Sequence, residues 1–482
     1  MSASVKPNLV GGQWVDGRGV VANVNPSNTS DVVAEYAHAD AAQAQAAVEA
    51  AAAAQPAWAA ATPYQRFEVL DRAGAEVLAR ATELGDLLSR EEGKTLIEGV
   101  GEATRAGQIL KFAAGEALRV TGDQLDSVRP GVEVTVTREP LGVVSVITPW
   151  NFPIAIPAWK IAPALAFGNA VVFKPAELVP GCAWELADIL VRAGLPEGVL
   201  NLVIGSGREI GPTLTQNPLV DGVTFTGSVG TGERVLQAAQ VHRSRVQLEM
   251  GGKNPLVVCD DADLDIAVEV AMQGSFGSTG QRCTASSRLV VTPGIHDGFV
   301  AAMTEAMQRW VVDDARKPGT HMGPVVDAAQ LDQDERYIEV ARTEGADVVG
   351  GRRVHRDTEG FYLEPALVVG TTNSMTVNRE EVFGPVASVI RVEDYDEAVA
   401  VANDTEFGLS SGIVTTSLAK ASHFRRASTA GMVMVNLPTA GVDFHVPFGG
   451  RRASSYGTRE QGTYAREFFT TVKTSYTAPG RP

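Results

Sequence analysis

A single cysteine, Cys283, stands in the stretch FGSTGQRCTASSR (residues 276–288) among glycines and small polar residues. Small residues let a ligand approach the backbone closely, and a thiol in such a setting can act as a nucleophile. The other two cysteines, Cys182 and Cys259, lie in apolar or strand-like contexts that are typical of inert core thiols. A lone cysteine is more often structural than catalytic. The glycine-rich polar setting favours a reactive Cys283, but it does not settle the question.

Two further polar residues come at the ends of predicted strands. Asn151 in TPWNFP (148–153) lies between two prolines, and an amide held in a rigid turn suits the stabilisation of an oxyanion. Glu249 in QLEMGGKNP (247–255) is followed by two glycines, so its carboxylate could move and serve as a general base.

Two glycine-rich turns are candidates for a phosphate site. FTGSVGTG (225–232) follows a predicted strand and enters a predicted helix, so Gly227 and Ser228 offer donors to an anion. Taken alone, this turn is equally well a structural one. IGSGREIG (204–211) is similar to a dinucleotide fingerprint, but its glycine spacing is one residue too long. A plain turn into a helix explains the second stretch at least as well.

A lysine and a carboxylate follow the predicted strand in VVFKPAE (171–177). Ligands of parallel sheets bind at the carboxyl ends of the strands, and Lys174 with Glu177 would suit the hydroxyl groups of a ribose. A solvated surface ion pair explains this segment equally well on its own.

The elements that must position these residues form an α/β pattern. From residue 142, short β-branched runs alternate with helical stretches, which predicts a parallel sheet covered on both faces, and a second such pattern begins near residue 254. Upstream, an apolar stripe from Val69 to Leu88 predicts one long helix from Pro63 that Gly93 ends. Residues 8–24 read as a short hairpin. Residues 131–140 and 468–477 alternate like strands and are expected to pair with each other or with another subunit.

Composition excludes several classes of function. A net charge of −16 over 482 residues argues against a nucleic-acid partner. The scattered histidines and three cysteines predict neither a metal site nor a disulfide framework. No signal peptide or apolar run of membrane-spanning length is present, so we expect a cytoplasmic protein.

Together these segments resemble the NAD(P)-dependent aldehyde dehydrogenase superfamily over essentially the whole chain. In detail, segments such as ELVPGCAW and STGQRCTASSR are most similar to the α-ketoglutaric semialdehyde dehydrogenase branch. The motifs that carry the resemblance stand in the family's order and spacing: TPWNFP, FKPAE, FTGS, LEMGGKNP, GQRC, EEVFGPV and PFGG.

The resemblance implies a Rossmann-like cofactor domain, an α/β catalytic domain and a small β oligomerisation arm. The cofactor domain would comprise residues 1–126 and 142–250, the catalytic domain residues 251–435, and the arm residues 127–141 and 464–482. An arm with exposed edge strands implies a homodimer or homotetramer.

The resemblance also assigns catalytic roles. Cys283 would attack the aldehyde carbon, Asn151 would hold the oxyanion, and Glu249 would activate the water that releases the acid from a thioester. Lys160 and Glu460 would form a proton relay beyond the general base.

NAD or NADP is the implied cofactor, with NAD favoured because a carboxylate at Glu177 would repel a 2′-phosphate. Lys174 beside it could accept that phosphate, so the preference stays open. The implied cofactor-binding residues are Thr148, Trp150, Lys174, Glu177, Gly227, Ser228, Gly251, Glu381 and Phe383.

Arg282 departs from the commonest family choices at its position. Its charge could lower the pKa of the neighbouring thiol, bind the distal carboxylate of a semialdehyde, or pair with an acid for structural reasons. Ile154, Arg282, Thr284 and the segment 437–445 are expected to line the substrate tunnel.

Four rival interpretations remain. A CoA-acylating relative would lack Glu249, and a cysteine hydrolase would need a histidine partner that no motif supplies. A non-catalytic NAD-binding relative should have lost Cys283, Glu249 or Asn151. An aldehyde dehydrogenase of broad aliphatic or aromatic specificity is the strongest alternative to one that acts on a semialdehyde.

Overall fold

The computed structural model describes residues 5–480, and its first large sheet has eight strands. The strands lie in the order β19-β11-β10-β7-β8-β9-β1-β2, and the five from β11 to β9 run parallel. Their bounds are β1 Asn8–Val10, β2 Gln13–Val15, β7 Val143–Ile147, β8 Ala170–Lys174, β9 Leu200–Leu202, β10 Gly222–Thr226, β11 Arg245–Glu249 and β19 Ser455–Tyr456. The central strands are buried along their length, as expected for a parallel sheet covered by helices.

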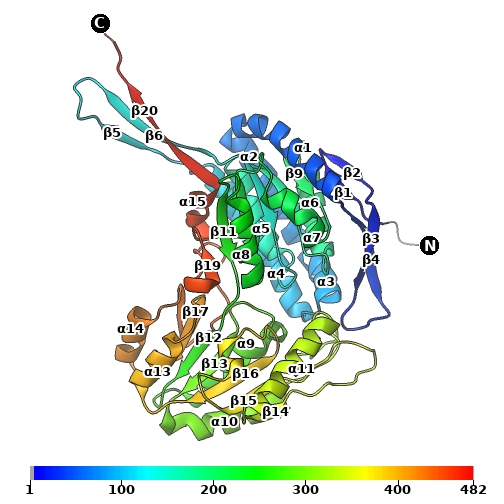
Figure 1. Ribbon diagram of the computed structural model, residues 1–482, viewed down its shortest axis with the longest axis vertical. Helices are drawn as coiled ribbons and strands as arrows, with labels where there is room; N and C mark the ends of the chain where they lie inside the picture. The colour runs from blue at the N-terminus through cyan, green and yellow to red at the C-terminus, as the bar shows by residue number, and fades with distance from the viewer. Residues whose placement is uncertain (1–4, 481–482) are drawn as a thin grey trace.

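Helices cover this sheet (Figure 1). Those between the parallel strands are α5 (Ala155–Ala166), α6 (Gly181–Arg192), α7 (Gly207–Thr215) and α8 (Val229–Ala239). The N-terminal helices are α1 (Ala41–Ala60), α2 (Pro63–Ala79), α3 (Ala81–Glu92) and α4 (Leu96–Ala117).

The N-terminal region differs from the sequence-based expectation in two respects. The single helix expected from Pro63 is wrong, because Arg80 leaves helical geometry and separates α2 from α3; Gly93 does end α3, with φ 95°. The hairpin expected over residues 8–24 is only β1 and β2, which turn at Gly11 and Gly12. Strand β3 (Gly19–Val24) pairs instead with β4 (Val32–His38).

The second large sheet has seven strands in the order β14-β15-β16-β13-β12-β17-β18. All pairs are parallel except that of β14 with β15. The strands are β12 Asn254–Val258, β13 Ser286–Val291, β14 Asp347–Gly350, β15 Ala366–Thr371, β16 Val386–Arg391, β17 Ser410–Val414 and β18 Met432–Val435. Its helices are α9 Leu264–Phe276, α10 Pro293–Gln308, α11 Ala328–Thr343, α12 Thr376–Arg379, α13 Tyr395–Asn403 and α14 Leu418–Ala427.

A three-stranded sheet forms an arm that projects from the body beside the first sheet (Figure 1). Strand β20 (Thr470–Thr477) pairs antiparallel with β6 (Glu133–Pro140), which confirms the expected pairing of these two segments. Strand β5 (Asp123–Asp126) completes the sheet and starts ahead of the predicted arm. Helix α15 (Arg466–Phe469) leads into β20. The boundaries expected for the cofactor domain, the catalytic domain and the arm remain a prediction.

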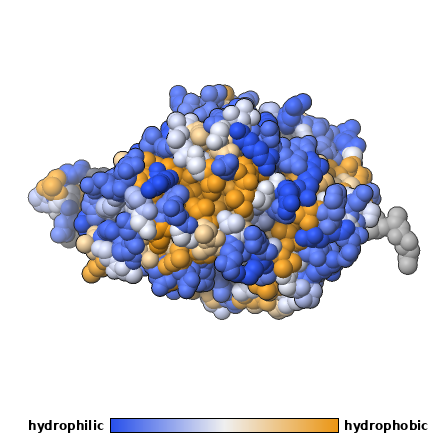
Figure 2. Space-filling model, turned by 90° about the horizontal axis from the view of Figure 1, so that it is seen from below, coloured by the Kyte–Doolittle hydropathy of each residue, from blue (hydrophilic) through white to orange (hydrophobic). Residues whose placement is uncertain are grey.

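Apolar residues reach the surface in groups. In Figure 2 the end of the molecule that lies lowest in Figure 1 carries apolar residues across its middle, with hydrophilic residues around them. The arm exposes Leu125, Val128, Val472 and Tyr476. Contiguous apolar patches often mark contact surfaces between proteins. Within residues 5–480, no helix combines the length and the apolar character that a membrane crossing requires.

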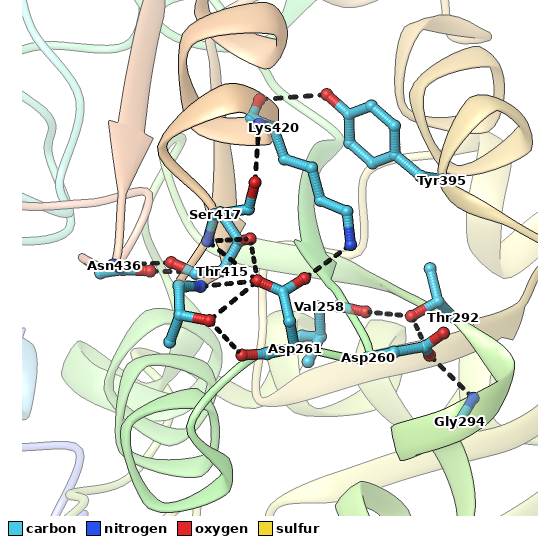
Figure 3. Close-up of polar contacts among 11 residues, drawn as sticks. Val258, Asp260, Asp261, Thr292, Gly294, Tyr395, Thr415, Ser417, Lys420 and Asn436 are labelled. Atoms are coloured by element: carbon cyan, nitrogen blue, oxygen red, sulfur yellow. Dashed lines mark hydrogen bonds and ion pairs between the residues drawn. The ribbon is translucent and has the colours of Figure 1, made fainter.

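Asp261 connects the end of β12 to the start of α14 (Figure 3). Its carboxylate accepts hydrogen bonds from the Thr415 hydroxyl at 2.6 Å, the Ser417 N–H at 2.9 Å and Lys420 Nζ at 2.6 Å. Burial acts to raise the pKa of Asp261, but Lys420 and the threonine hydroxyls together hold that pKa well below its usual value. The ionised side chain therefore stabilises the junction between strand and helix.

We expect Asp261→Asn to lower the free energy of unfolding by about 1–3 kcal/mol near neutral pH, because charged hydrogen bonds are lost. A lowered folded-state pKa stabilises the protein above the unfolded pKa of about 4 and loses its effect below it. The difference in melting temperature between wild type and variant should therefore narrow as the pH falls from about 5 towards about 3. Equal destabilisation by Asp265→Asn, at an exposed aspartate of α9, would contradict this assignment.

Candidate functional site

The loop that carries Cys283 has an unusual backbone. Ser278, Thr279 and Gly280 follow α9 with φ of 50°, 56° and 65°, and non-glycine residues in this left-handed region cost on the order of 1–3 kcal/mol each. The N–H of Ser278 donates to Glu98 Oε1 of α4 at 2.6 Å, which helps to hold the turn. Strain of this kind persists where surrounding contacts over-determine the conformation, so the loop has a fixed shape.

Two asparagines hold the backbone on either side of the thiol. Asn254, the first residue of β12, donates through Nδ2 to the carbonyl oxygens of Cys283 at 2.7 Å and of Ala285 at 2.9 Å. Asn151, which follows β7, donates through Nδ2 to the Gln281 carbonyl at 2.9 Å. An amide carries two hydrogens, so Asn151 keeps one for an oxygen atom beside Cys283. Asn254 is part of the LEMGGKNP motif, but no role was expected for it from the sequence.

Glu249 lies at the carboxyl end of β11 and is 2% exposed. Its Oε2 accepts a hydrogen bond from the Ser455 hydroxyl at 2.6 Å. Burial, and next the negative charge of Glu460, raise the pKa of Glu249 well above its ordinary value. A carboxyl group with a raised pKa is suited to accept a proton near neutral pH.

Lys160 and Glu460 form a buried ion pair behind Glu249. Lys160 Nζ also donates to Thr224 Oγ1 at 2.8 Å, and Trp159 Nε1 donates to Glu460 Oε2 at 2.7 Å. The structure thus brings the predicted relay pair into contact and places its charge close enough to act on Glu249.

The thiol of Cys283 is partly buried between carboxylates. Burial, followed by the charges of Glu381 and Glu249, raises the pKa of Cys283 far above its ordinary value. The site therefore keeps the thiol protonated near neutral pH.

A cleft of about 960 Å³ runs along the carboxyl ends of the first sheet. It is lined by six of the predicted cofactor residues, Thr148, Trp150, Lys174, Glu177, Gly227 and Ser228. Gly207 and Gly211 of the second glycine-rich stretch line it as well, at the start of α7. Both glycine-rich turns therefore face one cleft.

The cleft fits the implied dinucleotide. The hydroxyl oxygens of Thr148 and Thr226 are buried in its wall and have no hydrogen-bond partner among the described residues, so a ligand could satisfy them. The helix α8 starts at the cleft after Ser228, whose side chain makes no capping hydrogen bond, so its first N–H groups can meet phosphate oxygens.

Lys174 and Glu177 take different positions in this cleft. Lys174 is buried, its Nζ donates to the Pro175 carbonyl at 3.1 Å, and burial lowers its pKa. Glu177 is more exposed, and its Oε1 lies 3.4 Å from Nε2 of His38, a neighbour that the sequence analysis missed. The partly exposed carboxylate of Glu177 could therefore accept hydrogen bonds from the hydroxyl groups of a ribose in the cleft.

Glu381, Gly251 and Phe383 meet near the cysteine loop. Glu381 Oε1 accepts the Gly252 N–H at 2.8 Å, and a Cβ at Gly251 would lie 2.2 Å from Glu381 Oε2, so a side chain at Gly251 would displace the Glu381 carboxylate. Burial raises the pKa of Glu381 to about 7. Phe383 adopts φ 65° and packs edge-on against Trp150, with ring centroids 5.4 Å apart.

The predicted substrate residues are placed differently from expectation. Ile154 is 0% exposed in the hydrophobic core rather than on an open wall, because it directly precedes the fully buried helix α5. Thr284 is buried, and its carbonyl accepts the Thr439 hydroxyl at 2.7 Å. The Arg282 guanidinium donates to the carbonyl oxygens of Gln273 and Gly274 of α9, and it lines a small cavity with Glu381 and Phe383.

Comparison with known proteins gives consistent results over the whole chain. The aldehyde dehydrogenase family model matches residues 14–475. The chain is 42% identical over 478 residues to an α-ketoglutaric semialdehyde dehydrogenase of Bacillus subtilis, which covers 98% of both proteins. It is 43% identical over 477 residues to an α-ketoglutarate semialdehyde dehydrogenase of Haloferax volcanii, covering 97% of this chain and 98% of that protein.

Solved structures share the fold at lower sequence identity. A betaine aldehyde dehydrogenase of Staphylococcus aureus in complex with NAD+ superposes with a TM-score of 0.96 at 31% identity, covering 99% of this chain and 96% of that one. An NAD-dependent aldehyde dehydrogenase of Sinorhizobium meliloti superposes with a TM-score of 0.96 at 34% identity, covering 99% and 96%.

We expect iodoacetamide to label Cys283 alone, because Cys182 and Cys259 are fully buried. A raised thiol pKa means that the thiolate fraction still grows with pH above neutrality, so the labelling rate should rise about tenfold per pH unit between about pH 7 and about pH 9. Peptide mass spectrometry of the cofactor-free protein at several pH values measures this rate, with Cys283→Ser as the control. A rate that levels off below about pH 8 would show a lowered pKa instead.

Proposed function

The chain belongs to the aldehyde dehydrogenase family, and from this premise we propose that Cys283 is its nucleophile, Asn151 its oxyanion donor and Glu249 its general base. The protein is an NAD(P)-dependent oxidoreductase of aldehydes. One observation carries the assignment of residues: Asn151 and Asn254 hold the backbone on both sides of Cys283, with an amide hydrogen of Asn151 left unused.

Cys283 acts by forming a covalent bond between its sulfur and the aldehyde carbon, while its S–H proton passes to the nearby carboxylate of Glu249 and from there towards Glu460. The oxygen of the aldehyde then becomes an oxyanion, which the Asn151 amide and the N–H of Cys283 stabilise by hydrogen bonds. When bound in the cleft, NAD(P)+ supplies the acceptor for the hydride that the substrate carbon gives up. The left-handed turn at residues 278–280 keeps the sulfur in one position throughout.

Glu249 serves the release of the acid. Its raised pKa lets it take a proton from water, and the resulting hydroxide attacks the acylated carbon. The C–S bond then breaks, which releases the acid and leaves Cys283 as a thiolate. The proton then has a route to Glu460 and Lys160, whose ion pair is buried behind the base. The hydrogen bond from Ser455 holds the carboxylate towards that pair.

The proposed substrate is a semialdehyde that carries a carboxylate, such as α-ketoglutaric semialdehyde. The most similar relatives described above bear the names of α-ketoglutaric semialdehyde dehydrogenases at 42% and 43% identity. An enzyme of broad aliphatic or aromatic specificity is the alternative, and a panel of charged and uncharged aldehydes separates the two.

NAD is the proposed cofactor rather than NADP. Glu177 lines the cleft and is partly exposed, so its charge would repel a 2′-phosphate. Lys174, the nearest lysine, is largely buried and already bonded to a backbone carbonyl, which makes it a poor partner for that phosphate.

A homo-oligomer is the proposed assembly. Strand β20 has an unpaired edge in the sheet order β20-β6-β5, and the arm exposes apolar side chains. Exposed strand edges find partners readily, so the arm suits pairing with a second copy of the chain.

We expect Glu249→Gln to lower the steady-state rate by about 100-fold or more, because the water loses its base. The nucleophile stays intact, so one equivalent of reduced nicotinamide per site should form in the first turnover. Stopped-flow absorbance measures that burst, and Cys283→Ser serves as the control without a burst. A steady rate near that of wild type would remove Glu249 from its role.

We expect Glu177→Gln to improve NADP binding by about tenfold, because the repulsion of the 2′-phosphate is lost. NAD binding should change much less. Quenching of tryptophan fluorescence measures both affinities without turnover. If the NADP affinity does not change in this variant, Glu177 has no part in the preference.

A further inference from the structure

Arg105 of α4 is a half-buried cation whose hydrogen-bonding capacity is only partly used. One guanidinium nitrogen, Nη2, donates to Gln461 Oε1 at 3.3 Å, while Nε is buried and has no partner in the described part of the chain. Gln461 is 3% exposed, and its Nε2 is likewise buried without a partner between residues 5 and 480. Buried donors without acceptors are rare, so this pair calls for an acceptor that the chain itself does not provide.

No carboxylate of residues 5–480 forms an ion pair with Arg105. Glu102, one turn earlier on α4, is paired with Lys94 at 2.7 Å, and Asp443 is exposed to solvent. Burial lowers the pKa of Arg105, while Glu102 and Asp443 act from a distance to raise it. A guanidinium group that stays charged in such a place favours an anion as its ligand.

An apolar groove begins beside this pair. Ile109, Phe112 and Ala113 follow Arg105 on the same face of α4 at intervals of four, seven and eight residues, and they line the groove with Trp159 and Gln461. Arg105 lies 5.8 Å from the centroid of the Trp159 ring. Arg105 adjoins the groove through Gln461 and Trp159, and Glu116, the carboxylate that also lines it, is paired with Arg119 at 2.9 Å. Hydrocarbon walls beside a cation fit a short aliphatic chain that ends in a carboxylate.

The same helix is bound to the loop of the oxyanion donor. Glu102 Oε1 accepts the N–H groups of Ile154 and Ala155 at 3.2 Å each. Lys94, its ion-pair partner, donates to the Asn151 carbonyl, and Asn151 holds the backbone before Cys283. Arg105 is thus anchored one helical turn from contacts that lead directly to the nucleophile.

We propose that Arg105 and Gln461 bind the distal carboxylate of the aldehyde substrate and so select semialdehydes over uncharged aldehydes. This inference rests on the proposed function of Cys283. It replaces Arg282 as the recognition residue, because the guanidinium of Arg282 is already bonded to backbone carbonyls of α9 on the side of Glu381 and Phe383.

The test compares glutaric semialdehyde with pentanal, which has the same carbon chain without the carboxylate. Arg105→Met should lower kcat/KM for glutaric semialdehyde by about 100-fold, mainly through KM, because a bidentate charged contact is lost. The value for pentanal should change by less than about threefold. Gln461→Glu keeps the shape of the side chain but adds a charge that repels the carboxylate, so it should give the same pattern.

Two matched variants complete the design. Arg105→Lys keeps the charge and should restore part of the activity with glutaric semialdehyde. Arg309→Met, at an exposed arginine next to α10, should behave as wild type with both aldehydes. Melting temperatures of all variants confirm that they fold.

Equal losses with both aldehydes, or no loss with glutaric semialdehyde, would overturn the inference while leaving the proposed function intact. If the proposed function were wrong, the result would differ: the wild-type protein would reduce no NAD with either aldehyde, or the Cys283→Ser variant would be active. In that case calorimetry decides the inference independently: wild type should bind glutarate at least about tenfold more tightly than Arg105→Met does, with pentanoate bound equally by both. Equal glutarate binding by the two proteins would reject it.

Discussion

The hydrogen bonds that fix the backbone around Cys283 are the constraint on which the rest of the structure depends. Asn254 starts a strand of the second sheet, and Asn151 follows a strand of the first, so Cys283 is held from both sheets at once. Strand β12 must begin, and strand β7 must end, at the right place for these two amides to meet one loop. The left-handed turn at residues 278–280 completes the placement.

Burial then sets the chemistry of the charged groups. Glu249, Glu381 and the thiol of Cys283 all have raised pKa values because solvent is excluded, and neighbouring carboxylates raise the pKa of Glu249 and Cys283 further. The buried ion pair of Lys160 with Glu460 places two further charges near Glu249. A site of this kind holds its protons until a ligand changes the local charge, which suits a cysteine that should react only when its substrate has arrived.

Much of this architecture follows from local sequence patterns. The β-branched runs predicted the parallel strands, and alternation in residues 131–140 and 468–477 predicted the arm strands that pair. Asn151 and Glu249 stood out because proline or glycine flanks them at predicted strand ends, and Cys283 stood out because of its glycine-rich polar setting. Their roles came from the family resemblance. Asn254 and Arg105 gave no such signal, since their importance lies in long-range contacts and in unused hydrogen bonds. The break at Arg80 was missed because the apolar stripe continues across it.

The central claim is that the substrate becomes bound through the sulfur of Cys283. Intact-protein mass spectrometry tests it most directly, on the Glu249→Gln protein quenched in acid after mixing with NAD+ and glutaric semialdehyde. The account predicts a mass increase equal to one acyl group, located on the Cys283 peptide and absent when NAD+ is omitted. An unmodified protein that has produced reduced nicotinamide, or an acyl group on Cys182 or Cys259, would contradict it.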